Sequence, residues 1–142
     1  KLRVELGKPI EMGAGRAGHR RIIPIIGGVS EGPDITGEVL NIGADWQTVY
    51  SDGAAHLDTR YALRTDDEAV IEIINVGSRY GPADVIARLA EGQDVDPSEY
   101  YMRTAARLET GAQNYAWVNH TVFVCAGVRH SNAVEIAYYA VE

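Results

Sequence analysis

Residues 46–63, WQTVYSDGAAHLDTRYAL, show most directly what kind of structure the chain forms. Ser51-Asp52-Gly53 separates two runs that are rich in aromatic, aliphatic and threonine residues. An Asp-Gly pair favours a tight turn, because glycine readily adopts the positive φ that such turns require, and the flanking composition favours strands. The stretch therefore predicts a β-hairpin with arms at 46–50 and 55–64.

Similar runs recur along the rest of the chain, and its fifteen glycines separate many of them. The pattern predicts strands at 2–6, 20–26, 36–42, 46–50, 55–64, 69–76, 100–108, 115–128 and 133–141. One helix is expected over 82–91, since Pro82 suits its first turn and Gly92 its end. Short strands separated by turns are typical of sandwiches and barrels.

Residues 115–127 are apolar on both alternating faces, which indicates that both faces are covered. In a barrel, one face would line the lumen and the other would contact a helix or a second subunit. No linker, repeat or low-complexity stretch divides the 142 residues. We therefore predict one all-β domain over 1–142, a single antiparallel β-barrel with one short helix, and we expect it to form homo-oligomers.

Charge and hydropathy narrow the expected partners and location. The net charge of −7 argues against binding a nucleic-acid backbone, which usually needs a basic face. No apolar run approaches the roughly 18 residues of a membrane span, and the first residues alternate like a strand. We expect no nucleic-acid partner, no membrane partner and a cytoplasmic location. The single Cys125 lies in an apolar run and is expected to be a buried thiol.

One motif points toward a nucleotide, but its context does not support that function. Residues 13–18, GAGRAG, match the dinucleotide pattern G-x-G-x-x-G. That pattern needs a helix after it, whose amides hold the pyrophosphate. Here HRRIIPIIGG follows, which favours a strand, so we interpret 13–18 as a hairpin loop and expect no cofactor. The four histidines have no paired spacing, so we also expect no metal site.

Polar residues that interrupt apolar strands are the candidates for a functional site. Arg60, Arg103 and Asn119 have such apolar or aromatic neighbours that a position in the lumen is favoured over one in water. His56, Arg64 and Arg107 are as consistent with an exposed position. A buried charge must be paired, so a lumen with arginines would hold an arginine–carboxylate network. Such a network either stabilises the barrel or shifts a carboxylate pKa far enough for acid–base chemistry.

Six motifs give the chain a resemblance to a family of small, mostly bacterial proteins known as domain of unknown function 3237. The motifs are Ile25-Ile26-Gly27-Gly28, Gly43-Ala44-Asp45-Trp46-Gln47, Asp58-Thr59-Arg60-Tyr61, Glu99-Tyr100-Tyr101-Met102-Arg103-Thr104, Glu109-Thr110-Gly111 and Trp117-Val118-Asn119. The resemblance implies an up-and-down, calycin-like or lipocalin-like barrel that self-associates. It makes six polar positions candidate lumen residues: Asp45, Arg60, Tyr101, Arg103, Glu109 and Asn119.

Three functions remain open for such a barrel, and each assigns roles to those residues. A cofactor-independent lyase, isomerase or cyclase would use Asp45 or Glu109 as acid or base. Its carbonyl-polarising groups would be Arg60, Tyr101 and Asn119, with Arg103, Trp46 and Trp117 contacting the ligand. The alternatives are a lipocalin-like carrier of an apolar or aromatic molecule and a structural or interaction module. An enzyme or a carrier needs a small organic molecule in an open cavity of about 300 Å³ or more.

Overall fold

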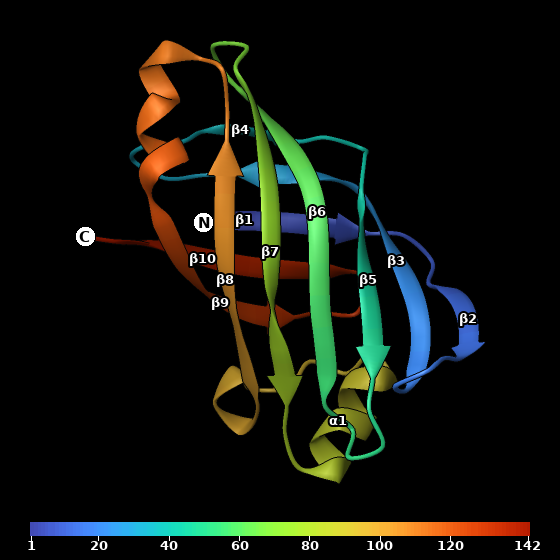
Figure 1. The fold of residues 1–142 in the computed structure, drawn as a ribbon. Helices are drawn as coiled ribbons and strands as arrows, with labels where there is room; N and C mark the ends of the chain where they lie inside the picture. The colour runs from blue at the N-terminus through green and yellow to red at the C-terminus, as the bar shows by residue number, and fades with distance from the viewer.

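Ten strands and three short helical segments make up the chain, and the computed structural model describes all 142 residues (Figure 1). The strands are β1 (Leu2–Leu6), β2 (Ile10–Ala14), β3 (His19–Ser30), β4 (Gly37–Val39), β5 (Ala44–Val49), β6 (Ala55–Thr65), β7 (Val70–Tyr80), β8 (Tyr101–Glu109), β9 (Val122–Arg129) and β10 (Ala133–Val141). The helical segments are α1 (Ala83–Ala90) and the 3-10 helices η1 (Pro97–Glu99) and η2 (Gln113–His120).

The strands close into an antiparallel barrel. From β6 to β10 each strand pairs with the next, and β10 then pairs with β1. Closure comes from β1, which also pairs with β3. β4 and β5 both lie between β3 and β6, so they share one of the eight positions around the barrel. β2 pairs only with β3 and lies outside this ring. The predicted all-β barrel is confirmed.

Two local features explain how the ring is built. The predicted turn at 51–53 is confirmed: Gly53 has a φ of +87° and its amide donates to the carbonyl of Tyr50 at 3.0 Å. At the closure, β1 lies so near β3 that a Cβ on Gly28 would stand 1.9 Å from the carbonyl oxygen of Arg3. Only glycine permits that approach, so the closing pair of strands depends on position 28.

The core has two parts, one toward each end of the barrel. Figure 1 shows α1 at one end and η2 (orange) at the other. On the η2 side the core includes the fully buried Leu63, Ile71 and Ile73. On the α1 side Val85 and Leu89 pack with strand residues in a smaller cluster. α1 confirms the helix expected over 82–91. No helix of the chain is long and apolar enough to cross a membrane.

Two sequence-based predictions are wrong: the strand expected over residues 115–120 and the single helix. Residues 115–120 belong to η2 rather than to a strand, so the chain has more than one short helix. Their alternation resembled a strand, but local side-chain bonds favour a helical turn over a sheet ladder. Asn119 bonds the backbone of Thr110, and the Thr121 hydroxyl donates to the carbonyl of Trp117 at 2.8 Å. Residues 13–18 close the β2–β3 hairpin as predicted, and a strand follows them.

Candidate functional site

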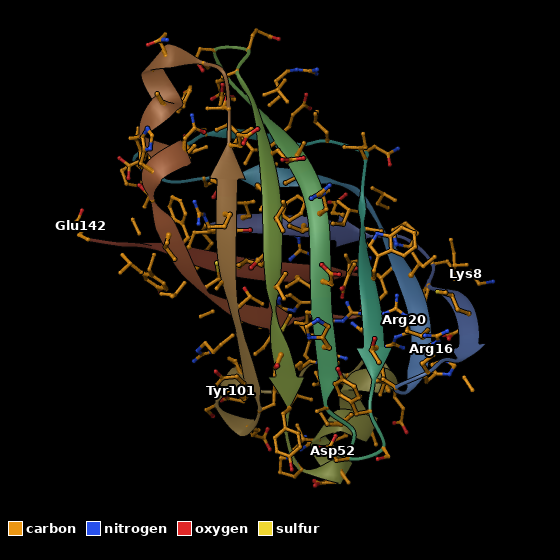
Figure 2. The ribbon with its side chains drawn as sticks, in the orientation of Figure 1. Lys8, Arg16, Arg20, Asp52, Tyr101 and Glu142 are labelled. Atoms are coloured by element: carbon orange, nitrogen blue, oxygen red, sulfur yellow. The ribbon has the colours of Figure 1, made fainter.

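The structure places one of the predicted site residues, Asp45, among the groups that line the lumen. Four others point outward into solvent: Arg60, Tyr101, Arg103 and Glu109. Strand alternation explains this correction. On β6 the neighbours Leu57 and Tyr61 are buried, so the opposite face, with Arg60, is outside. The same period puts Tyr101 on the outer surface of β8, where it is labelled in Figure 2.

Asn119 is also outside the lumen, and its contacts are structural. Its Oδ1 accepts from the amide of Thr110 at 2.8 Å, and its Nδ2 donates to the carbonyl of the same residue at 2.9 Å. These bonds join η2 to the end of β8. The two tryptophans are separate from each other: Trp46 is 45% exposed on β5, and Trp117 packs on Phe123 with ring centroids 6.0 Å apart. The predicted cluster is therefore not assembled.

A different polar cluster occupies the lumen, on neighbouring strands at matching positions. Asp45 on β5 pairs with Thr59 on β6, and Thr59 pairs with Asn75 on β7. All three line the same internal cavity. Gln47 is two residues along β5 from Asp45, and Arg79 is four residues along β7 from Asn75, each on the inward face. Polar groups thus follow one side of the lumen from the middle toward the α1 end.

Asp45 is a buried carboxylate with few partners. Its Oδ1 accepts from the amide of Asp58 at 2.9 Å, and its Oδ2 accepts from Nε2 of Gln47, also at 2.9 Å. Gln47 in turn accepts from Nε of Arg21 at 2.7 Å. Burial raises the pKa of Asp45 above its ordinary value, and the two hydrogen bonds and the nearby cations Arg79 and Arg21 offset only part of that rise. The carboxyl group of Asp45 therefore loses its proton at a higher pH than an exposed aspartate does.

Three arginines from three strands lie within electrostatic range of this carboxylate: Arg21 on β3, Arg79 on β7 and Arg129 on β9. Their charges act on one another and on Asp45. Burial, followed by the charges of Arg129 and Arg21, lowers the pKa of Arg79 to about 10. Arg79 therefore stays cationic at neutral pH. It is 8% exposed, and its Nε is buried without a hydrogen-bond partner.

Two of these arginines, Arg79 and Arg129, lie where two hollows meet. An inner cavity of about 60 Å³ includes Asp45 and Asn75 in its lining. Outside it, a vestibule of about 600 Å³ is bounded by α1, the β1–β2 connection and the turns after β5 and β9. Arg79 and Arg129 line both hollows. Figure 2 labels Asp52 on the β5–β6 turn, at the same end as α1 and the vestibule.

Two tyrosines lie beyond the inner cavity, between it and a hollow of about 110 Å³ at the η2 end. Tyr61 and Tyr138 share a hydrogen bond between their hydroxyls, and Nδ2 of Asn75 donates to the Tyr138 hydroxyl at 3.3 Å. Burial raises the pKa of both tyrosines above their ordinary value, so both stay neutral. Cys125 is buried as predicted, and burial raises the pKa of its thiol to about 11. No three His, Cys, Asp or Glu side chains gather to hold a metal ion.

The sequence contains a signal for Asn75 and Arg79, which were not among the predicted site residues. On β7, Ile71 and Ile73 share a face with Asn75 and Arg79. Two consecutive inward isoleucines predict that the next alternate positions face inward as well. The predicted strand ended at residue 76, which left Arg79 outside it. Arg129 is the last residue of β9, where alternation gives little information.

The fold and the lumen define a class of protein, a closed antiparallel β-barrel whose polar, charged cavity opens at the α1 end. The chain belongs to the family described as "Protein of unknown function (DUF3237)", whose model matches residues 1–141. It is 40% identical over 140 residues to the UPF0311 protein RPA1785 of Rhodopseudomonas palustris, a match that covers 99% of this chain and 92% of the relative.

Two solved structures extend the comparison. A β-barrel-like protein from Acinetobacter baumannii has a TM-score of 0.88 at 44% identity, over 99% of this chain and 91% of its own. An enzyme from Penicillium herquei has a TM-score of 0.71 at 18% identity, over 100% of this chain and 91% of its own. At that identity the likeness to the Penicillium protein establishes a shared fold alone.

Proposed function

We propose that the barrel binds a small organic anion at the junction of the vestibule and the inner cavity, and that it catalyses proton transfer there without a cofactor. The observation that carries the proposal is Arg79, a buried guanidinium whose Nε has no partner. Burying a cation without a paired anion is costly. A site that carries this cost in the free protein is suited to a ligand that removes it.

The balance of charge supports an anion as the ligand. Three guanidiniums, those of Arg21, Arg79 and Arg129, lie within electrostatic range of one carboxylate, Asp45, so three positive charges minus one negative leave two. The arginine salt bridges of the chain involve other residues, all at the surface. A carboxylate suits this site because a guanidinium binds both of its oxygens at once.

The position of Asp45 supports catalysis in addition to binding. Asp45 would take a proton from the carbon beside a substrate carbonyl, and the electron pair left on carbon would move onto the carbonyl oxygen. The resulting negative charge would be stabilised by the guanidiniums of Arg79 and Arg129. In an isomerase, the protonated Asp45 returns the proton to another atom. In a lyase, the electron pair expels a leaving group from the next carbon, and Asp45 protonates that group.

The carrier and the structural module are the competing functions. The vestibule, at about 600 Å³, exceeds the roughly 300 Å³ expected of a ligand site, which favours a ligand-binding function over a structural module. Asp45 favours the enzyme over the carrier, because a carrier of anions gains nothing from a carboxylate beside its arginines. The Penicillium herquei protein, which shares this fold, is described as an enzyme, so the fold is compatible with catalysis.

The experiment separates binding from proton transfer. A panel of aliphatic and aromatic oxo-carboxylates is screened by thermal shift, and binders are incubated in D₂O and followed by proton NMR. We expect the wild type to bind and to exchange protons beside the carbonyl. Asp45→Asn should keep the thermal shift and lose the exchange.

Two arginine variants make a matched pair for the same assay. Arg79→Met should abolish the thermal shift, whereas Arg60→Met, the same change on the exposed face of β6, should preserve it. An equal shift in both variants would contradict the proposed anion site. Binding without exchange for every binder in the panel would leave the carrier as the function.

A further inference from the structure

The inner cavity contains a second unpartnered polar group, with the opposite hydrogen-bonding character to Arg79. Oδ1 of Asn75 is buried and accepts no hydrogen bond, although Nδ2 of the same side chain donates to Tyr138. Asn75 is 3% exposed and lines the cavity. An unsatisfied acceptor in a buried cavity favours a ligand group that can donate.

This acceptor lies deeper in the barrel than the arginines and at the level of Asp45. Thr59 pairs with Asp45 on one side and with Asn75 on the other, so Asp45 and Asn75 lie across two strand spacings, roughly 10 Å between Cα atoms. Arg79 follows four residues farther along β7, roughly 13 Å between Cα atoms of the same strand. Oδ1 of Asn75 and the guanidinium of Arg79 therefore lie at the two ends of the space that one ligand would occupy.

The size of the cavity limits what reaches Asn75. At about 60 Å³ it is well below the roughly 150 Å³ of an apolar protein cavity that accommodates benzene. It has room for a small substituent and not for a ring. The part of a ligand that extends inward from the arginines must therefore be narrow, such as an unbranched chain that ends in one polar group.

We propose that the inner cavity is the subsite for a hydroxyl-bearing end of the ligand, and that the preferred ligands are hydroxy-carboxylates. The carboxylate binds Arg79 and Arg129, and the hydroxyl donates to Oδ1 of Asn75, beside Asp45. The inference rests on the proposed anion site and adds that the other end of the ligand carries a hydroxyl.

The test uses paired probes that differ in one group. The series runs from 4-hydroxybutyrate to 8-hydroxyoctanoate, and each member is paired with the acid in which a methyl replaces the hydroxyl. Affinities for the wild type are measured by calorimetry. We expect one chain length to bind the hydroxy acid about tenfold more tightly than its methyl partner, because a buried acceptor gains its missing donor. The length that binds best reports the span from Arg79 to Asn75.

Variants then assign the preference to a residue. Asn75→Leu should remove the preference for the hydroxyl while the methyl-ended acid still binds. Asn41→Leu, the same change at an exposed position, should leave the preference intact. If Asn75→Leu does not fold, the wild-type pairs alone decide.

The outcomes separate the two proposals. If both acids bind equally and Arg79→Met abolishes their binding, the hydroxyl subsite is wrong and the anion site stands. If no acid of the series binds the wild type at ten-millimolar concentrations, the hydroxyl subsite is wrong, and the oxo-carboxylate screen decides on the anion site. A preference for the hydroxyl that persists in a folded Asn75→Leu variant also overturns the subsite.

Discussion

The two ends of the lumen differ in their packing and in whether their polar side chains have hydrogen-bond partners. At the η2 end, Leu63, Ile71 and Ile73 are almost wholly buried, and the hydroxyls of Tyr61 and Tyr138 bond each other. At the α1 end the lumen opens into the vestibule, and the buried guanidinium of Arg79 has an Nε without a partner. Both ends use the same strands and the same alternation.

The difference separates stability from function within one barrel. Apolar residues at the closed end contribute free energy of folding without a ligand. Polar groups at the open end reduce that free energy, because their desolvation is not offset within the chain. Substitutions at the two ends are therefore expected to change stability in opposite directions.

The largest effect is expected at the closed end. Leu63→Ala should lower the free energy of unfolding by about 2–5 kcal/mol, because it leaves a cavity in the packed core. Chemical denaturation measures the change. Val70→Ala is the control, since Val70 is 47% exposed and should cost far less. Equal costs for the two variants would show that the closed end is not the stabilising part.

Arg79→Met tests the open end and should act in the opposite direction. We expect the free energy of unfolding to stay level or rise by about 1–4 kcal/mol, because an apolar side chain of similar length replaces an unpaired buried cation. Denaturation of the ligand-free protein measures it, with Arg60→Met expected to change it by less than about 0.5 kcal/mol. A marked loss of stability in Arg79→Met would indicate that the arginine cluster holds the barrel together.

Asn119→Leu should affect stability rather than ligand binding. The substitution removes both hydrogen bonds to the backbone of Thr110, and we expect a cost of about 1–3 kcal/mol. Affinity for anions, measured on the folded fraction, should be unchanged because Asn119 lies outside the lumen. Lost binding with an unchanged melting temperature would restore Asn119 as a site residue.

The pH dependence of stability should identify Asp45. Because its pKa is raised in the folded state, its contribution is fully present below the ordinary value of 3.8 and is lost as pH rises through the folded value. The unfolding free energy of the wild type minus that of Asp45→Asn should therefore fall as the pH rises above 3.8. Urea titrations of both proteins measure this difference, in which other carboxylates cancel. A constant or rising difference contradicts a raised pKa.

Self-association remains a prediction, and we expect its surface on the outer wall between the two ends. Val76, Ala105, Val124 and Tyr139 form one exposed row across β7, β8, β9 and β10. A second copy of the chain could bury this row, which lines a shallow hollow on the outer surface. Light scattering should show a dimer or larger species that Val124→Lys dissociates. Val70→Lys is the control, because Val70 is a similarly exposed valine at the first position of β7.

The fold was predictable from sequence because its signals are local. The Asp-Gly turn and the alternation in β6 depend on residues close together in the chain. The lumen was less predictable, because it depends on which face of each strand turns inward. Arg60 and Arg79 both interrupt apolar strands, and only the parity set by Leu57 or by Ile73 separates them. The role of Asn119 required a helical segment that its alternating sequence concealed.

The seam between β1 and β10 has a consequence for how the barrel folds. Leu2 pairs with Ile136, 134 residues away, and also with Ser30. The β6–β7 and β7–β8 pairs need no such distant partner, so we expect this meander to assemble early and the seam to be completed last. Pairing over such sequence distances is slow, on the order of milliseconds to seconds. Until this final step seals the wall, the lumen is open along one side as well as at its α1 end.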